Sequence, residues 1–170
     1  MPSYNYNYCP YCGSTLSYVN NHYRCLNDHV IYMNSAPAVG AIIYDGGSRV
    51  LLTRRASNPY KGQWDVPGGF LEYGEDPEAG IRREIIEELG IEITIEEFLG
   101  HYISLYAEKN EENGRFVLNM FYLVTANVSN ASASDDVDAF SWFEITKLPQ
   151  NLAFPVNRLV LDRVCGRILK

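Results

Sequence analysis

The sequence predicts an α/β protein in which two helices pack on a sheet as an α/β/α sandwich, preceded by a small cysteine-bearing module. Segments with the composition of strands surround two segments with the periodicity of helices. Three of the four cysteines stand before residue 30, ahead of the first long strand. The 170 residues, 46% of them hydrophobic, suffice for one domain and a small module, which we place at 35–170 and 1–34.

The larger unit begins as a β-hairpin. Ala38–Tyr44 and Val50–Arg54 have the composition of strands, and Asp45-Gly46-Gly47-Ser48 between them is a strong turn signal. Further strands are predicted, in chain order, at Ile91–Tyr106, Phe116–Val124 and Ala139–Phe143, with a polar loop at 109–114 between the first two.

A helix is predicted at Pro77–Leu89 from the chemistry of its ends. Asp76 can act as the N-cap, Pro77 suits the first helical position, and Gly90 suits the C-terminal stop. The 3.6-residue period gives this helix an apolar stripe that should face a core: Ile81, Ile85 and Leu89.

A second helix is predicted at Pro155–Leu169, where it can cover the sheet. Its expected inward residues are Leu159, Val160, Val164 and Ile168. Cys165 is expected in this helix as a buried free thiol.

Three glutamates share one face of the first helix. Glu87 and Glu88 follow Glu84 by three and four residues, which brings the three side chains together on a helix. Their like charges therefore repel one another. Arg83 can relieve Glu87 but cannot neutralise the whole group. The helix alone leaves two interpretations open: a solvated acidic face, or a site for a hard cation such as Mg²⁺, which prefers several oxygen ligands.

The residues ahead of this helix favour the cation site. The stretch GGFLEYGEDPEAGIRREIIEELGI at 68–91 resembles the signature of the Nudix hydrolases at every fixed position, and WDVPGG at 64–69 resembles its lead-in. The fixed positions are occupied here by Gly69, Glu75, Arg83, Glu84, Glu87, Glu88 and Gly90, with aliphatic Ile85 and Ile91. Seven such residues would coincide by chance in far fewer than one chain in about 100,000.

This resemblance implies the Nudix α/β/α sandwich with a mixed sheet, and hydrolysis of a nucleoside diphosphate linked to another group, with Mg²⁺ or Mn²⁺ as cofactor. It also implies the roles of individual residues. Glu84, Glu87, Glu88 and the carbonyl of Gly69 would be metal ligands, Arg83 would orient a carboxylate, and Glu75 would brace the loop or lie in an outer metal shell. Gly68 and Gly69 let the backbone approach the metal closely.

The N-terminal cysteines resemble a zinc ribbon. CPYC at 9–12 looks like one ligand turn, and RCLNDH at 24–29 looks like a second turn that departs from the usual Cys-x-x-Cys pattern. We favour Cys9, Cys12, Cys25 and His29 as ligands of a structural zinc, because imidazole suits thiolate-bound zinc better than a carboxylate does. His22 and Asp28 are alternative fourth ligands, and a ribbon without metal is the other alternative.

A ribbon joined to a Nudix signature is similar to a branch associated with ADP-ribose and FAD, which would be split into AMP and a second phosphate product. NADH pyrophosphatases also carry a ribbon, but their SQPWPFP-type motif has no counterpart here beyond Phe-Pro in LAFPVN at 152–157. The alternatives are an NADH pyrophosphatase, a hydrolase that removes unwanted nucleoside triphosphates, and a non-catalytic ADP-ribose sensor.

Several other residues are candidates for contact with substrate or water. Arg54 and Arg55 could bind phosphate, although strand alternation lets at most one of them point inward. The candidate rings for stacking on a base or flavin are Tyr44, Tyr60, Phe70 and Phe154. The candidate general bases are Asp135, Asp136 and Asp138 in the stretch 134–142, or Glu87 and Glu88 themselves.

The overall composition narrows the classes of partner. A net charge of −7 argues against broad nucleic-acid binding, and no apolar run reaches the length of a membrane span. The first residues, MPSYNYNYCPYC, lack the features of a signal peptide, so we expect a cytoplasmic enzyme with a small-molecule nucleotide substrate. The oligomeric state is left open, with a homodimer among the options.

Overall fold

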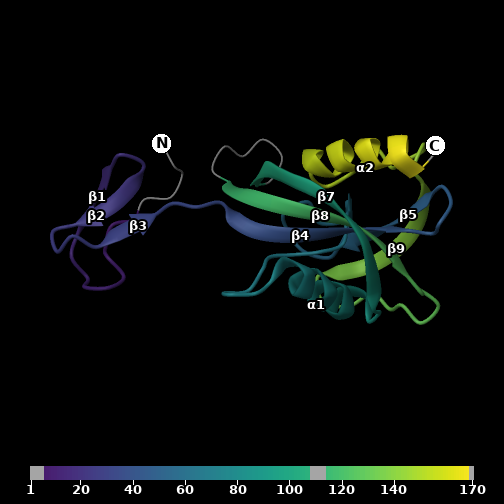
Figure 1. Cartoon of the computed structure of the whole chain (residues 1–170), viewed down its shortest axis with the longest axis horizontal. Helices are drawn as coiled ribbons and strands as arrows, with labels where there is room; N and C mark the ends of the chain where they lie inside the picture. The colour runs from purple at the N-terminus through teal and green to yellow at the C-terminus, as the bar shows by residue number, and fades with distance from the viewer. Residues whose placement is uncertain (1–5, 108–113, 169–170) are drawn as a thin grey trace.

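The computed structural model describes residues 6–107 and 114–168, and these form two separate sheets (Figure 1). The N-terminal sheet is antiparallel, with β1 (Leu16–Val19), β2 (His22–Cys25) and β3 (Val30–Tyr32) in sequential order. The sequence did not lead us to expect these three short strands. An extended stretch leads from β3 into the first strand of the larger sheet.

The larger sheet is mixed. Its strand order is β6-β5-β4-β8-β7, with β9 paired to β5. The strands are β4 (Ala36–Tyr44), β5 (Arg49–Arg55), β6 (Trp64–Asp65), β7 (Ile93–Tyr106), β8 (Arg115–Ala126) and β9 (Val137–Glu144). β4 runs parallel to β8, whereas the other pairs are antiparallel. All five predicted strands are present, longer than predicted by a few residues in most cases.

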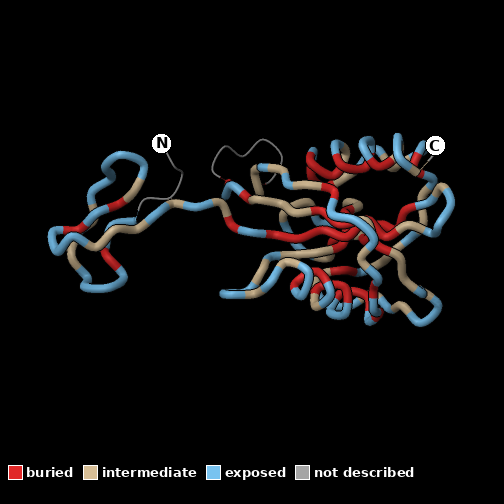
Figure 2. Tube along the Cα trace, viewed as in Figure 1, coloured by how far each residue is buried: buried red, intermediate tan, exposed pale blue. Residues whose placement is uncertain are grey.

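The two helices cover opposite faces of this sheet, so the predicted α/β/α sandwich is confirmed (Figure 1). The helix α1 (Pro77–Leu89) has the bounds that the sequence predicts, and α2 (Pro155–Ile168) begins where predicted. Leu169, the predicted end of α2, lies outside the described residues, as does most of the predicted loop at 109–114. Figure 2 shows buried residues on the inner faces of both helices and along the central strands.

The inward face of α2 differs from the prediction. Leu159 was expected to face the sheet, but 62% of its surface is exposed. The buried residues of α2 are Val156, Asn157, Val160, Leu161 and Val164. Cys165 is a free thiol as expected, but it is half-buried rather than buried.

Strand β7 is irregular and forms one edge of the larger sheet. Its pairing with β8 shifts between Ile95 and Glu97 and again between Phe98 and Gly100. Each shift inserts an extra residue in β7, which bends the strand and increases its local twist.

Candidate active site and metal centre

The acidic helix α1 is held in place by its ends and by its apolar face. The carboxylate of Asp76 accepts hydrogen bonds from the amides of Glu78 and Ala79 at 2.9 and 3.3 Å. Gly90 adopts the left-handed conformation, with φ of 68°, and its amide donates to the carbonyl of Ile86. The residues Ile81, Ile85 and Leu89 are fully buried against the sheet. The adjoining face, with Glu84 and Glu88, is therefore held in a fixed position beside the sheet.

Arg83 is the centre of the carboxylate cluster. Its Nε and Nη2 donate to the two oxygens of Glu75 at 2.8 and 2.9 Å, a bidentate pair. Its Nη1 donates to Glu84 at 2.9 Å and to Glu87 at 2.8 Å, and Nη2 also donates to the carbonyl of Phe70. The hydrogen bonds from Arg83 lower the pKa of Glu75 to about 2. One guanidinium thus orients three carboxylates and the loop that precedes the helix.

Glu84 and Glu88 are buried, with 9% and 4% of their surfaces exposed. Burial raises the pKa of both carboxyls. The shift is larger for Glu88, where the charges of Asp136 and Asp65 add to the effect of burial. The amide of Gly68 donates a hydrogen bond to Glu88 at 3.1 Å, which lowers the pKa of Glu88 and partly offsets this rise. Two adjacent buried carboxylates of this kind favour a bound cation as their partner.

The loop glycines touch this cluster closely. A Cβ at Gly69 would lie 2.5 Å from the carboxylate carbon of Glu84. Gly68 has φ of 140°, and a Cβ there would lie 2.2 Å from the carbonyl oxygen of Val39. The carbonyl of Gly69, predicted as a metal ligand, accepts a hydrogen bond of 2.9 Å from the amide of Val39 and has a second lone pair left. A side chain at Gly68 would therefore collide with backbone atoms, and one at Gly69 would force the Glu84 carboxylate to move.

Of the three aspartates predicted as candidate bases, Asp135 and Asp136 lie in a turn, whereas Asp138 lies in β9. The amide of Ser134 donates to the carbonyl of Glu88 at 2.9 Å, which anchors this turn to the end of α1. After burial, the charge of Asp136 is the largest cause of the raised pKa of Glu88. Asp138 instead forms an exposed 2.6 Å ion pair with Arg54. Of the three candidates, Asp136 is thus the one whose charge raises the pKa of Glu88.

Of the two adjacent arginines, Arg54 points to solvent and Arg55 points inward, as strand alternation predicts. Arg55 donates to Asp65 at 2.8 Å, to the carbonyl of Pro59 at 2.6 Å and to the hydroxyl of Tyr106 at 3.1 Å. Asn157 of α2 donates to the other oxygen of Asp65 at 2.5 Å. This buried network was not predicted, because no sequence spacing links β5, β6, β7 and α2.

The candidate stacking rings form a connected row. Phe70 contacts Tyr106 edge-on at 5.3 Å between centroids, Tyr106 stacks on Phe154 at 5.3 Å, and Phe154 contacts Tyr60 edge-on. Tyr106 was missed, whereas Tyr44 packs apart from the row against the core beneath α2. A cavity of about 70 Å³ lies beside this row and is also lined by Gly68, Gly69, Arg55 and Asp65.

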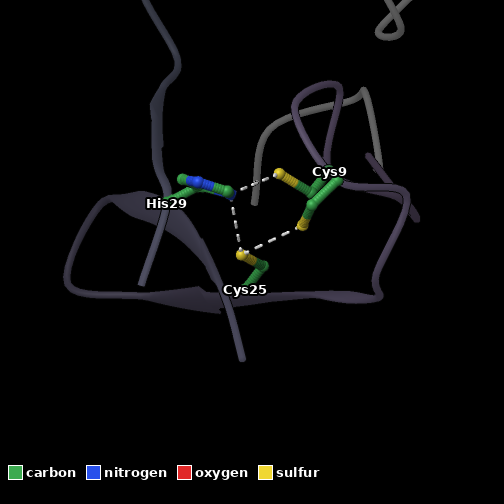
Figure 3. Close-up of side chains that lie close together, drawn as sticks. Cys9, Cys25 and His29 are labelled. Carbon is green, nitrogen blue, oxygen red and sulfur yellow. Dashed lines mark hydrogen bonds between the residues drawn. The ribbon is translucent and has the colours of Figure 1, made fainter. Parts of the chain in front are cut away.

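Beside the N-terminal sheet, the four residues favoured as zinc ligands come together, and Figure 3 shows three of them, Cys9, Cys25 and His29. The four residues are Cys9, Cys12, Cys25 and His29, and their ligand atoms all lie within 4.8 Å of one another. The Nδ1 of His29 is 3.5 Å from the Sγ of Cys9 and 3.6 Å from that of Cys25. His22 lies elsewhere, with its Nδ1 at the carbonyl of Asn20. Three sulfurs and one nitrogen are a donor set that suits tetrahedral zinc.

Comparison with known proteins agrees with this architecture. Residues 34–164 match the NUDIX domain family. An ADP-ribose pyrophosphatase from Methanocaldococcus jannaschii is 31% identical over 139 residues, which cover 82% of this chain and 79% of that protein. The human mitochondrial NAD(P)H pyrophosphatase is 38% identical over 80 residues, 47% of this chain and 22% of that protein.

A solved structure extends the likeness across nearly the whole chain. A NUDIX hydrolase from Nitrosomonas europaea superposes with a TM-score of 0.79 at 25% identity, covering 95% of this chain and 92% of that one. No helix among the described residues has the length and apolarity to cross a membrane. With the family match covering most of the sequence, the chain belongs to the Nudix hydrolase family.

Proposed function

We propose that this protein is a Mg²⁺- or Mn²⁺-dependent pyrophosphohydrolase that splits ADP-ribose or FAD into AMP and a second phosphate product. The observation that carries this proposal is the carboxylate cluster of α1 beside the glycine loop. Glu84 and Glu88 are buried there, and among the described residues the cluster contains one cationic side chain, that of Arg83, which donates to Glu84 and Glu87. The relative from Methanocaldococcus jannaschii, named for ADP-ribose, supports the substrate class.

The chain's own groups suit a cation and a pyrophosphate. Glu84, Glu87, Glu88 and the carbonyl of Gly69 would hold the ion. When bound, the ion neutralises phosphate charge and lowers the pKa of a coordinated water. Arg83 keeps the carboxylates oriented through its bonds to Glu84 and Glu87.

Proton transfer falls to a carboxylate of the same cluster. Glu88 is the buried candidate for the general base, and Asp136 is its acidic neighbour. The raised pKa of Glu88 makes it a stronger base than an ordinary glutamate. Water adds to one phosphorus, its proton passes to the base, and the bridging P–O bond breaks. For ADP-ribose the products are AMP and ribose 5-phosphate, which together contain the atoms of the substrate and one water.

The cysteine and histidine group supports a second, structural role for metal. We propose that Cys9, Cys12, Cys25 and His29 bind Zn²⁺ and thereby stabilise residues 1–34, since the small N-terminal sheet buries few residues of its own (Figure 2).

A substrate panel tests the proposed function. Purified protein with Mg²⁺ or Mn²⁺ is assayed on ADP-ribose, FAD, NADH, nucleotide sugars and nucleoside triphosphates, with products identified by chromatography. We expect AMP from ADP-ribose or FAD. NADH is the second candidate, because the human relative is named for NAD(P)H. If no compound is hydrolysed with either ion, the enzyme proposal is wrong and a nucleotide sensor is the better interpretation.

A further inference from the structure

A second, much larger cavity is lined by residues of the N-terminal sheet, of the segment that leads from it, and of the Nudix domain. It has a volume of about 960 Å³, near the upper end of the range of roughly 300–1,000 Å³ that is typical of ligand sites. The small cavity beside Gly68 and Gly69, at about 70 Å³, falls well below that range and cannot enclose a nucleoside. A substrate whose pyrophosphate lies at the acidic helix therefore needs further space for its rings.

Aromatic side chains gather in this large cleft. Nine exposed aromatic side chains occur among the described residues, and five of them line it. The N-terminal sheet contributes Tyr18 and Tyr32 among these, and the Nudix domain contributes Phe70 and Phe116. Exposed rings of this kind are suited to stack on a nucleobase or flavin, which offers a flat apolar face with polar edges.

The cleft also has polar groups that suit a nucleotide. Arg115, at the start of β8, lines it and makes no ion pair with any described residue, so its guanidinium can meet a phosphate or a ring face. Asn21, Asn34 and Ser35 add amide and hydroxyl groups that can hydrogen-bond a base edge. No acidic side chain lines the cleft among the described residues.

Phe70 connects the cleft with the carboxylate cluster. Its side chain lines both cavities, and it directly follows Gly69. Its carbonyl accepts a hydrogen bond from Arg83, and the next residue, Leu71, donates its amide to the carbonyl of Pro37 in the wall of the cleft. The cleft and the small cavity beside the acidic helix therefore share Phe70 as a common wall.

We propose that this cleft binds an aromatic ring of the nucleotide substrate, so that the N-terminal sheet forms part of the substrate site. The proposal rests on the proposed function for the identity of the ligand. The cleft proposal goes beyond the proposed function in two ways. It gives Tyr32 and Phe116 a role in substrate affinity, and it gives the N-terminal module a role other than stability.

Steady-state kinetics with matched variants test this role. Tyr32→Ala and Phe116→Ala should each raise the KM for a substrate whose ring lies in the cleft by about tenfold, with kcat unchanged. Tyr8→Ala is the matched control in the N-terminal module, because Tyr8 is 67% exposed, Tyr32 is 69% exposed, and of the two only Tyr32 lines the cleft. Phe98→Ala is the matched control for Phe116→Ala, because both rings are exposed and of the two only Phe116 lines the cleft. Tyr32→Phe, which keeps the ring, should retain the wild-type KM.

ADP-ribose, NADH and FAD are compared, since ADP-ribose lacks the second ring. A KM raised only for NADH or FAD supports the proposal and places the second ring in the cleft, and a KM raised for all three supports it and places adenine there. An unchanged KM for all three, or an equal change in Tyr8→Ala and Phe98→Ala, overturns it.

A binding measurement separates failure of this proposal from failure of the proposed function. Equilibrium titration of wild type and variants with FAD, followed by flavin fluorescence, requires no turnover. If wild type hydrolyses nothing, the proposed function fails, yet a dissociation constant for FAD about tenfold weaker in Tyr32→Ala than in Tyr8→Ala still supports the cleft as a ring site. Equal dissociation constants, or no measurable FAD binding by wild type, overturn it.

Discussion

The backbone amide of Gly68 donates a hydrogen bond of 3.1 Å to Oε2 of Glu88, which lies 20 residues further along the chain. This contact joins the glycine loop to the acidic helix. It fixes one oxygen of the most deeply buried carboxylate in the cluster and leaves the other available.

Replacing Glu88 by glutamine should abolish most of the activity and preserve the fold. The amide side chain can still accept from Gly68, but it can neither take up a proton nor match the charge of a cation, so we expect kcat to fall by about 100-fold or more. Activity with Mg²⁺ and the circular dichroism spectrum are measured together. Glu92→Gln, an exposed change on the far side of Gly90, is the control, and near-normal activity of Glu88→Gln would exclude Glu88 from catalysis.

Gly69→Ala should lower both stability and activity, because its Cβ would lie 2.5 Å from the Glu84 carboxylate. Overpacking of this kind costs about 1–3 kcal/mol and would displace Glu84 from its place beside Arg83. Gly47→Ala is the matched control, since its Cβ would meet nothing closer than 3.4 Å. Denaturant unfolding and Mg²⁺-dependent kinetics measure the two effects; equal behaviour of the two variants would contradict the close approach.

The stability of the protein without added Mg²⁺ or Mn²⁺ should depend on pH through Glu84 and Glu88. Burial raises their pKa above the ordinary value of 4.5, so the folded state holds these protons more tightly than the unfolded state does. Their contribution to stability is therefore complete below pH 4.5 and is lost as the pH rises through the raised pKa. Tm is measured from about pH 5 to about pH 8. We expect Glu88→Gln to gain stability relative to wild type as pH rises; parallel curves would argue against the raised pKa.

Zinc binding should require His29 and not His22. His29→Ala removes a donor from a set that lies within 4.8 Å, whereas His22 lies outside that set. Elemental analysis should therefore show less zinc in His29→Ala and an unchanged amount in His22→Ala. Wild-type zinc content in His29→Ala would move the fourth ligand to another residue, and absence of zinc from wild type would contradict the site itself.

Asp65→Asn should destabilise the protein strongly. Arg55 and Asp65 have 10% and 12% of their side chains exposed, so the change leaves a buried guanidinium without its counter-charge, a loss of about 3–5 kcal/mol in comparable cases. Glu97→Gln, which breaks an exposed pair with Arg167, should cost less than about 1 kcal/mol. Chemical denaturation measures both, and similar losses would mean that burial does not set the importance of these pairs.

The predicted bounds of α1 are correct because the signals for its ends are local. Asp76, Pro77 and Gly90 act on residues within one turn, so their effect can be read without knowing the rest of the fold. The same holds for the apolar stripe of α1, which is confirmed, and for the hairpin of β4 and β5.

The inward face of α2 depends on distant partners, and there the prediction was wrong in part. Asn157 is buried because it bonds Asp65, 92 residues earlier, and this contact turns Leu159 towards solvent. Tyr106 was missed for a similar reason. Its role follows from contacts with Arg55, Phe70 and Phe154, which only the folded sheet brings together.

The bulged edge strand β7 also protects the folded chain from its neighbours in solution. A straight edge of 14 residues would offer a long row of backbone donors and acceptors to a strand of another molecule. The two extra residues, near Glu97 and Gly100, interrupt that row, and the charged side chains of Glu96 and Glu97 oppose close approach by a second copy. The irregularity thus limits edge-to-edge aggregation when the protein is concentrated.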